Sequence, residues 1–279
     1  MNDCPKVTII TPIHRDRNTL LQTIESVCTQ TYPNIQYIIN DDGPYCVDDS
    51  ISDTVAAYGT IKEFRLIHNQ ENMGISYTLN RAIEESDGEY VFNIADDDCF
   101  YDENVIMDWV QEFIRTGALV MTAKRAVYDN SMSEELGIDP PQIMIDRINN
   151  LSCMELFEQM SGHNYISGCV TAKKRELFDE WYGKYIEDYR TIEDYPSNML
   201  LLRNEVKIFF FDRIVLKYRS GGASSAVNID KLYFEESDRI FYREIYPYVR
   251  SKLRALFKYH WWKHSVRKYK KMSKQQSRS

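Results

Sequence analysis

The chain has 279 residues, of which 43% are hydrophobic and 27% are charged, an ordinary composition for a globular protein with one large domain or two small ones. Its formal net charge of −8 argues against nucleic acid as a partner of the protein body. No apolar run reaches the roughly 18 residues of a membrane-spanning helix, and six scattered cysteines without a CxxC pair or a leader sequence predict free thiols in a cytoplasmic protein.

Strands and helices are predicted to alternate through the first 115 residues. β-Branched and aromatic runs mark the strands, and apolar residues at helical spacing mark the helices. Thr19 and Gln22 fit a capping box at the start of the first helix. The predicted strands are 7–11, 35–39, 64–67 and 90–94, and the predicted helices lie around 20–28, 51–58, 75–83 and 105–113. This order predicts an α/β fold with a single, mostly parallel open sheet flanked by helices.

Two acidic clusters each follow a predicted strand. Asp41 and Asp42 follow the second strand, and Asp96, Asp97 and Asp98 follow the fourth. Ligands of open α/β sheets bind outside the carboxyl ends of the strands, so both clusters can converge on one ligand. Adjacent carboxylates at the end of a buried strand repel one another and lose hydration. A divalent Mg²⁺ or Mn²⁺ ion completed by substrate phosphates would offset that cost. The pattern predicts a metal–diphosphate site, and the alternative is a solvated acidic turn.

The second half of the sequence is less regular. Glu193 and Asp194 stand directly before a predicted helix, where acids are also ordinary capping residues. A long stretch without clear periodicity, 129–150, predicts a surface excursion of functional or mobile character. The other predicted elements are strands at 119–122, 166–170, 206–211 and 214–218, and helices around 154–160, 177–181, 199–202 and 230–270.

The charge is uneven along the chain. No acidic residue follows Glu244, whereas Lys and Arg recur up to Arg278. The aromatic stretch 259–262 lies inside this basic segment. Such a tail is compatible with contact to anionic lipid at the inner face of the membrane, with a solvated basic helix, or with a protein contact through Trp261 and Trp262. A homo-oligomer is a separate expectation for the chain.

Several motifs, taken in order, carry a family likeness. They are Thr11-Pro12, Asp41-Asp42-Gly43, Asn72-x-Gly74, Gly88-Glu89-Tyr90, Asp96-Asp97-Asp98 and Glu193-Asp194-Tyr195. The ordered set resembles the family 2 glycosyltransferases, inverting enzymes of the GT-A fold that use nucleotide-sugar donors. The likeness covers roughly residues 5–225. The second half is most similar to bacterial transferases that assemble capsule, lipopolysaccharide O-antigen or similar surface glycans.

The resemblance implies a division of the chain. A GT-A glycosyltransferase domain spans 1–225, with a nucleotide-sugar-binding half at 1–115 and an acceptor-binding, catalytic half at 116–225. A basic, helical C-terminal extension spans 226–279.

The resemblance also implies a role for each matching position on the donor side. Asp98 would be the metal ligand, and Asp96 would reach the ribose or the metal. Ala95 stands where many members have the first acid of Asp-x-Asp-Asp, so the register of the motif stays open by one residue. The other implied contacts are Thr11 and Pro12 to the nucleobase, Asp41 and Asp42 to base and ribose, and Asp97 within the DxD motif.

On the acceptor side, Asp194 stands at the position of the catalytic base, with Glu193 beside it. Ser167 and Gly168 lie where family members approach the acceptor and donor sugar. Many relatives carry a His after Tyr-Arg, and this chain has Ser220 there. Arg219 could partly substitute for that His as a diphosphate contact, and the alternative is a structural ion pair.

The implied function is a metal-dependent, inverting transfer of a sugar from a nucleotide-diphosphate sugar, UDP above all, to a hydroxyl of a glycan or lipid-linked acceptor. A sugar nucleotidyltransferase is one rival, but it would want a Gly-rich basic loop, and residues 14–17 contain no glycine. A non-catalytic glycan-binding or scaffold protein is the other rival, against which the intact Asp98 and Asp194 count.

Overall fold

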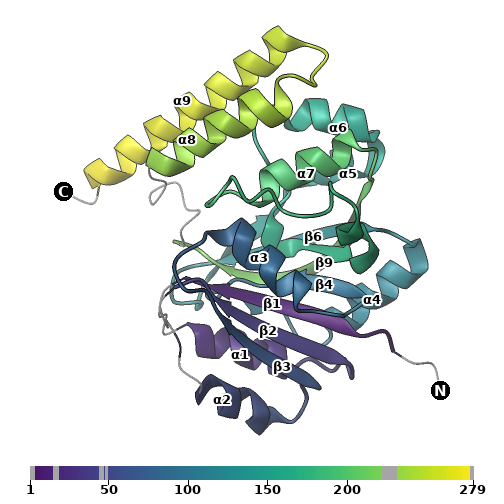
Figure 1. Cartoon of the computed structure of the whole chain (residues 1–279). Helices are drawn as coiled ribbons and strands as arrows, with labels where there is room; N and C mark the ends of the chain where they lie inside the picture. Colours follow the sequence, from purple (N-terminus) through teal and green to yellow (C-terminus); the bar gives the residue numbers. More distant parts are fainter. Residues whose placement is uncertain (1–3, 15–18, 44–46, 48–49, 222–230, 277–279) are drawn as a thin grey trace.

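The structure, a computed structural model, describes residues 4–14, 19–43, 47, 50–221 and 231–276, with side chains as far as Met272 (Figure 1). Residues 15–17, the small-residue loop that follows Gly221 and the terminal Arg278 lie outside the described residues. Of the six cysteines, Cys46 is also outside, and the other five carry free thiols as predicted. Within the described part of the chain, no helix combines the length and the apolar character needed to cross a membrane.

The described strands form one sheet. Its strands are β1 (Val7–Ile13), β2 (Ile35–Asp41), β3 (Glu63–His68), β4 (Tyr90–Asn93), β5 (Cys99–Phe100), β6 (Val120–Tyr128), β7 (Glu135–Asp139), β8 (Thr171–Lys174) and β9 (Ile208–Arg219). They lie in the order β3-β2-β1-β4-β8-β6-β9-β5, with β7 paired to β6. β1, β2, β3 and β4 are parallel, as expected, and so are β6 and β9. β8 runs antiparallel to both β4 and β6, so the whole sheet is mixed rather than mostly parallel.

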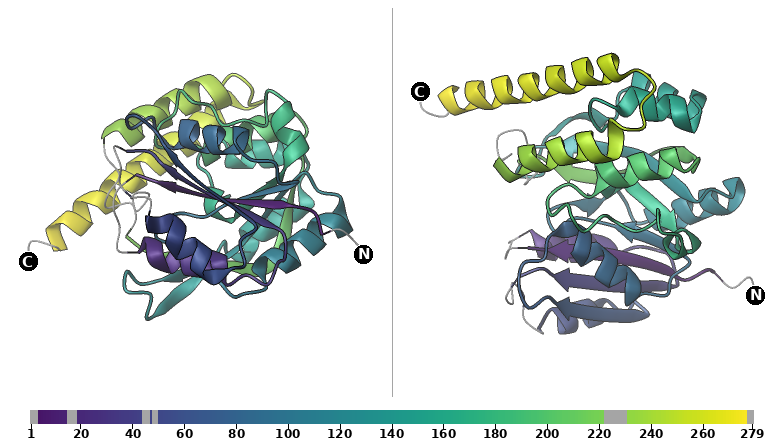
Figure 2. Two further views of the ribbon diagram at one scale, coloured as in Figure 1. Left: turned by 60° about the horizontal axis from the view of Figure 1, so that its bottom comes forward. Right: turned by 45° about the horizontal axis from the view of Figure 1, so that its top comes forward.

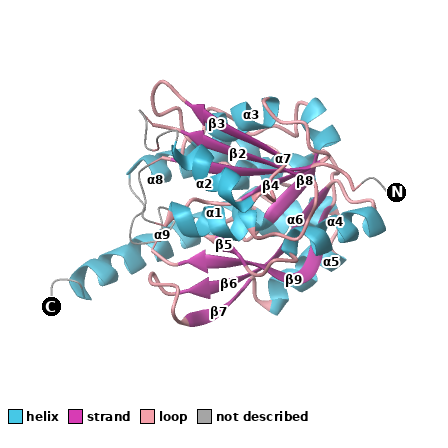
Figure 3. Ribbon diagram, turned by 90° about the horizontal axis from the view of Figure 1, so that it is seen from below, coloured by secondary structure: helices cyan, strands magenta, loops and turns pink. Residues whose placement is uncertain are grey.

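Helices cover both faces of the sheet (Figures 1 and 2). Their bounds are α1 (Leu20–Cys28), α2 (Ser50–Tyr58), α3 (Ile75–Glu84), α4 (Val105–Thr116), α5 (Gln142–Asn150), α6 (Cys153–Met160), α7 (Asp194–Arg203), α8 (Lys231–Ile240) and α9 (Lys252–Gln276). Apolar residues of α1, α2 and α4 form one core against the sheet, and those of α3 form another with the segment around Phe178. Seen from below, α1 and α2 lie across the strands (Figure 3).

A third core joins the C-terminal helices to the second half of the sheet. It contains Val120 of β6, Ile208 of β9 and buried residues of α6 and α7. Phe241, in the π-helical turn Phe241–Ile245 after α8, stacks on Tyr259 of α9 with ring centroids 4.1 Å apart. The basic extension therefore shares its core with the 116–225 half, and the boundary at 225 stays a prediction.

Several local expectations were wrong. The excursion at 129–150 contains β7 and α5, and the two strands expected at 206–218 are one strand whose pairing with β6 is irregular around Lys124. The helix expected around 177–181 is a short 3-10 turn, Arg175–Asp179, and the strand expected at 166–170 begins only at Thr171. Thr19 makes no side-chain cap, because its hydroxyl instead donates to the Asp96 carbonyl oxygen at 3.1 Å.

Candidate active site

The two predicted donor clusters flank the end of β1. The register pairs Ile13 of β1 with Asp41 of β2. On the other side of β1, the Ile94 amide donates to the Ile10 carbonyl at 2.9 Å, which carries the chain directly into the Asp96–Asp98 turn. Both clusters therefore lie at the carboxyl edge of the parallel strands, as the strand pattern predicted.

Asp42 is engaged by the protein itself. Its carboxylate accepts hydrogen bonds from the backbone amides of Met73 (2.7 Å) and Gly74 (2.8 Å) and from the Asn69 side chain (2.9 Å). These bonds tie the end of β2 to the start of α3. Gly74 has φ +92°, and an added Cβ would lie 2.8 Å from the Arg190 Cα, so this turn requires glycine.

Asp41 and Thr11 also direct their side chains inward. The Asp41 carboxylate accepts from the Gly43 amide and lies 3.1 Å from His68 Nδ1, while the Thr11 hydroxyl is 3.0 Å from the Tyr37 hydroxyl. Pro12 is half-buried. These residues lie at the carboxyl edge of the parallel strands, and their contact with a nucleotide stays a prediction.

The Ala95–Asp98 turn is fixed by α1. The Asp98 amide donates to the Ala95 carbonyl (3.2 Å), and the Asp98 carbonyl accepts from the Thr23 hydroxyl (2.7 Å). Together with the hydrogen bond from the Thr19 hydroxyl to the Asp96 carbonyl, these bonds hold the backbone of the acidic triplet in place. Asp96 is 7% exposed and Asp97 is half-buried in the same turn.

Asp98 carries the clearest sign of a cation site. Its side chain is buried, with the residue 1% exposed, and Oδ1 accepts from the Arg219 amide at 2.9 Å. Oδ2 is buried and has no hydrogen-bond partner, which is costly for a carboxylate. Burial, and next the charge of Asp97, raise the pKa of Asp98 to about 8. A divalent cation against Oδ2 would remove this cost, so the residue fits the expected metal.

The protein alone does not complete a metal shell. Among the described residues, no group of three or more His, Cys, Asp or Glu side chains could hold a metal ion. Mg²⁺ and Mn²⁺ in phosphate-transfer sites use one or two carboxylates and take the rest of their ligands from water and substrate phosphates. Asp98, with Asp96 in the same turn, fits that arrangement.

The side chain of Arg219, the proposed diphosphate contact, joins three segments of the chain through hydrogen bonds. Its Nε donates to the Asp97 carbonyl (2.9 Å), and its two terminal nitrogens donate to the Asn130 carbonyl (2.7 Å) and to the Gln22 side chain (2.5 Å). The residue is 7% exposed. The guanidinium thereby holds the end of β9 against the acidic turn, and a role toward a diphosphate stays a prediction.

Glu193 and Asp194 form the second acidic cluster, at the start of α7. The Gly168 amide donates to Asp194 Oδ2 at 3.1 Å. A Cβ on Gly168 would lie 2.9 Å from Glu193 Oε1 and 3.1 Å from the Asp194 Cβ, so a larger residue would make the Glu193 side chain shift. Burial raises the pKa of both carboxyl groups, and the Asp194 charge raises that of Glu193 further.

Arg125 of β6 lies near both clusters, and its own ion pair is with Asp139 at 3.0 Å. One of its terminal nitrogens donates to the Ser167 hydroxyl at 3.1 Å and lies 3.6 Å from the Cys169 sulfur. Its positive charge lowers the pKa of both Asp98 and Asp194, against the larger effect of burial. The Asp98 turn and the Glu193-Asp194 pair, almost a hundred residues apart in sequence, therefore lie in the field of one guanidinium.

Lys173 of β8 is a second buried cation near the pair. It is 3% exposed, its Nζ donates to the Ser197 hydroxyl at 2.8 Å, and it lies 4.2 Å from the centre of the Tyr185 ring. Burial lowers the pKa of Lys173 to about 7, and the charge of Glu193 opposes that shift. Sequence reasoning missed Lys173 and Arg125, because single cations in short strands are normally solvent-facing; their only signal was a charge inside a strand pattern.

Glu236 of α8 holds the segment that leads into the acidic pair. Its side chain is fully buried and accepts from the backbone amides of Arg190 (2.7 Å) and Thr191 (2.9 Å) and from the Thr191 hydroxyl (2.7 Å). Sequence reasoning also missed this residue, since one acid in a charged helix carries no distinguishing signal.

Comparisons with known proteins agree with this geometry. The family model described as glycosyl transferase family 2 matches residues 8–186. TuaG of Bacillus subtilis, a putative teichuronic acid biosynthesis glycosyltransferase, is 34% identical over 244 residues, covering 86% of this chain and 88% of the relative. An uncharacterized glycosyltransferase of Rickettsia felis is 27% identical over 219 residues, covering 77% of this chain but only 34% of that longer protein.

Solved structures show the same fold. Staphylococcus aureus TarS 1-349 in complex with UDP-GlcNAc has a TM-score of 0.64 at 16% identity and covers 91% of this chain and 70% of its own. The mannosyltransferase PcManGT from Pyrobaculum calidifontis, in complex with GDP-Man and Mn²⁺, has a TM-score of 0.58 at 14% identity. It covers 92% of this chain and 74% of its own. Both are glycosyltransferases of the GT-A fold.

Proposed function

Because the chain belongs to glycosyl transferase family 2 and has the GT-A fold, we propose that it is a metal-dependent, inverting transferase that moves a sugar from a UDP-sugar to a hydroxyl of a surface glycan. The observation that carries this proposal is the pair of carboxylate clusters, buried around Asp98 and half-buried around Asp194, in the field of Arg125. The relatives supply the substrate class: TuaG is named for teichuronic acid biosynthesis, and TarS binds UDP-GlcNAc.

On the donor side, the Asp98 turn supplies the oxygen ligands. Asp98 Oδ2, with Asp96 in the same turn, would hold a divalent cation, and the Mn²⁺ complex of PcManGT supports this choice. When bound, such a cation neutralises the charge that develops on the leaving diphosphate. The bonds from α1 and from Arg219 keep the turn fixed, so little reorganisation is needed when the donor arrives.

On the acceptor side, Asp194 is the general base. The acceptor oxygen forms a bond to the anomeric carbon as the bond from that carbon to the diphosphate oxygen breaks, and the hydroxyl proton passes to the Asp194 carboxylate. Attack opposite the leaving group inverts the anomeric carbon. Burial raises the pKa of Asp194, which makes its carboxylate a stronger base. The Gly168 amide holds one carboxylate oxygen and so orients the other.

Turnover of UDP-sugars tests the proposal. The purified chain with Mn²⁺ should release UDP from a panel of UDP-sugars, faster when glycan acceptors are added, and EDTA should stop the release. Asp98→Asn should abolish it and Asp194→Asn should slow it about 10²–10⁴-fold, whereas Asp53→Asn, on the exposed face of α2, should leave it unchanged. Release that survives EDTA or Asp98→Asn would refute the metal-dependent mechanism, and no release from any sugar nucleotide would favour a binding or scaffold protein.

A further inference from the structure

Helix α9 has two unlike faces. One face is packed: Ala255 and Tyr259 are buried, and Lys263 pairs with Asp238 of α8 at 2.5 Å. The opposite face carries three large apolar side chains that are strongly exposed. They are Leu253 (83% exposed), Phe257 (74%) and Trp261 (62%). Their spacing of four residues places them in one row along the helix.

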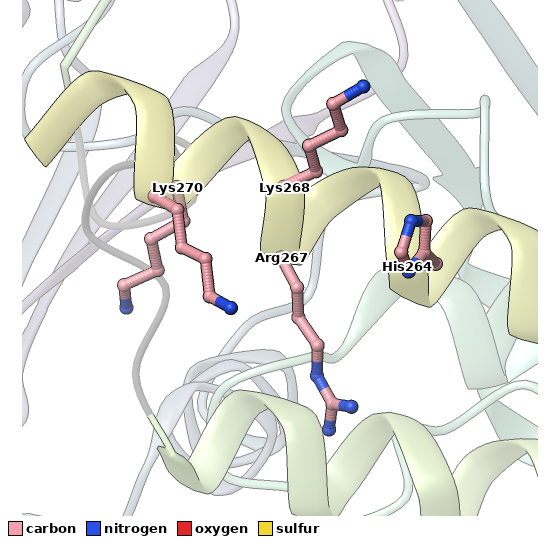
Figure 4. A pocket seen from close by; sticks show the side chains of 5 residues that line it. His264, Arg267, Lys268 and Lys270 are labelled. Atoms are coloured by element: carbon pink, nitrogen blue, oxygen red, sulfur yellow. The ribbon is translucent and has the colours of Figure 1, made fainter. Parts of the chain in front are cut away.

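The same face becomes cationic beyond Trp261. His264, Lys268 and Lys271 continue the row at spacings of three and four, and all three are exposed. They also line a hollow of about 620 Å³ along α9, to which only Lys, Arg and His residues contribute, mainly through their carbon atoms (Figure 4). Arg267, the next wall residue, turns toward α8, where its guanidinium lies over the Phe234 ring at 5.2 Å, while Lys268 points away from that contact.

The charge of this segment is opposite to that of the rest of the protein. Residues 245–279 contain eleven Lys and Arg and no acid, whereas the preceding residues contain 23 basic and 42 acidic side chains. A negatively charged surface is therefore attracted to the C-terminal segment and repelled by the body. This asymmetry both selects the partner's charge and orients the molecule on it.

We propose that the outer face of α9, defined by Leu253, Phe257, Trp261, His264, Lys268 and Lys271, binds the surface of an anionic lipid bilayer. The helix lies in the plane of the interface, with the apolar row at the boundary of headgroups and acyl chains and the cations among the phosphates. A nucleic acid would use the cations but leave the Leu and Phe row in water. A second copy docked symmetrically would bring two basic segments of equal sign together.

The placement of α9 gives this contact a use. In all three ribbon views, the C-terminal end of α9 and the carboxyl ends of the parallel strands lie on the side of the molecule opposite to the N-terminus (Figures 1 and 2). The cationic, C-terminal part of the outer face of α9 therefore lies on the side of the molecule where the Asp98 turn lies. The binding itself does not require the transferase chemistry to be right.

Vesicle co-sedimentation tests the contact. The full chain is mixed with vesicles of phosphatidylglycerol and phosphatidylcholine, or of phosphatidylcholine alone, at two salt concentrations. We expect binding only to the anionic vesicles, weakened by salt. Lys268→Gln with Lys271→Gln should weaken it about 30-fold, the expectation for two cations at an anionic surface. The matched control is Arg115→Gln with Lys231→Gln, two exposed cations on α4 and α8.

The apolar row needs its own pair of variants. Trp261→Ser should weaken binding at least tenfold, whereas Trp181→Ser, at a Trp that is 67% exposed elsewhere, should not. Donor turnover without acceptor should be unchanged in every variant. Equal binding to neutral and anionic vesicles would overturn the proposal, and so would unchanged vesicle binding by the α9 variants. It would also be overturned if light scattering showed that the α9 substitutions break a dimer while vesicle binding is retained.

Discussion

Asp98 is a carboxyl group that the fold holds almost out of water while leaving one of its oxygens without a donor. Burial keeps this carboxyl group protonated up to about pH 8, and a divalent cation against Oδ2 would stabilise its charged form. Asp42 differs from Asp98, because both oxygens of Asp42 accept hydrogen bonds from internal donors. Sequence reasoning treated both as ligand contacts, because adjacent acids after strands look alike until their hydrogen bonds are known.

The raised pKa of Asp98 predicts a pH dependence of stability. Because burial raises this pKa to about 8, the folded chain binds more protons than the unfolded chain between about pH 4 and pH 8. The metal-free protein should therefore lose stability as the pH rises through that window. Asp98→Asn keeps an oxygen that can accept the Arg219 amide and should flatten the slope. Thermal denaturation in EDTA from pH 5 to pH 8 measures both, and a slope unchanged by the substitution would contradict this account of Asp98.

A side chain at Gly168 should displace the Glu193 carboxylate. An alanine Cβ there would overlap Glu193 Oε1 at 2.9 Å, and overpacking of this kind costs about 1–3 kcal/mol. We expect Gly168→Ala to lower the free energy of unfolding by that amount and to reduce turnover, because the carboxylate pair must move. Denaturant unfolding of the single variants and of Gly168→Ala with Glu193→Ala checks the cause. The penalty should shrink in the double variant, and a full penalty there would place the clash elsewhere.

At the scale of elements, α8 is part of the acceptor half and not an appendage. Its Glu236 carboxylate fixes the backbone at Arg190 and Thr191, two residues before the acidic pair. The chain order gave no hint of this, because the contact joins a helix to a loop some 45 residues earlier. Local periodicity did predict α1, α3 and α4, whose apolar faces depend only on neighbouring residues.

Glu236→Gln should lower kcat while leaving the KM for the donor near its original value. A glutamine at this position would present an N–H group to the Arg190 and Thr191 amides, which need an acceptor. This mismatch costs about 1–3 kcal/mol, and it should loosen residues 190 and 191, which precede Glu193. The neighbouring Glu235→Gln is the matched control, since Glu235 is exposed and pairs with Lys231 one turn earlier on the same helix. Equal effects of the two substitutions on kcat would show that Glu236 has no positioning role.

At the scale of the whole molecule, the order of strands decides the function. β8 and β6 lie between β4 and β9, and Arg125 of β6 is close enough to the turn after β4 and to the start of α7 to lower the pKa of both Asp98 and Asp194. The parallel half was predictable because alternation of strands and helices forces parallel pairing. The antiparallel pairing of β8 and the position of Arg125 could not be predicted from the sequence, since both depend on contacts between residues far apart in sequence.

The most direct test of the central claim compares donor binding with turnover in two variants. UDP binding with Mn²⁺ is measured by calorimetry, and transfer by UDP release. Asp98→Asn should lose Mn²⁺-dependent UDP binding and therefore turnover. Asp194→Asn should bind UDP within about twofold of the unmodified chain yet turn over about 10²–10⁴-fold more slowly, the usual contribution of a general base. Unchanged UDP binding by Asp98→Asn, or normal turnover by Asp194→Asn, would contradict the division of roles between the two clusters.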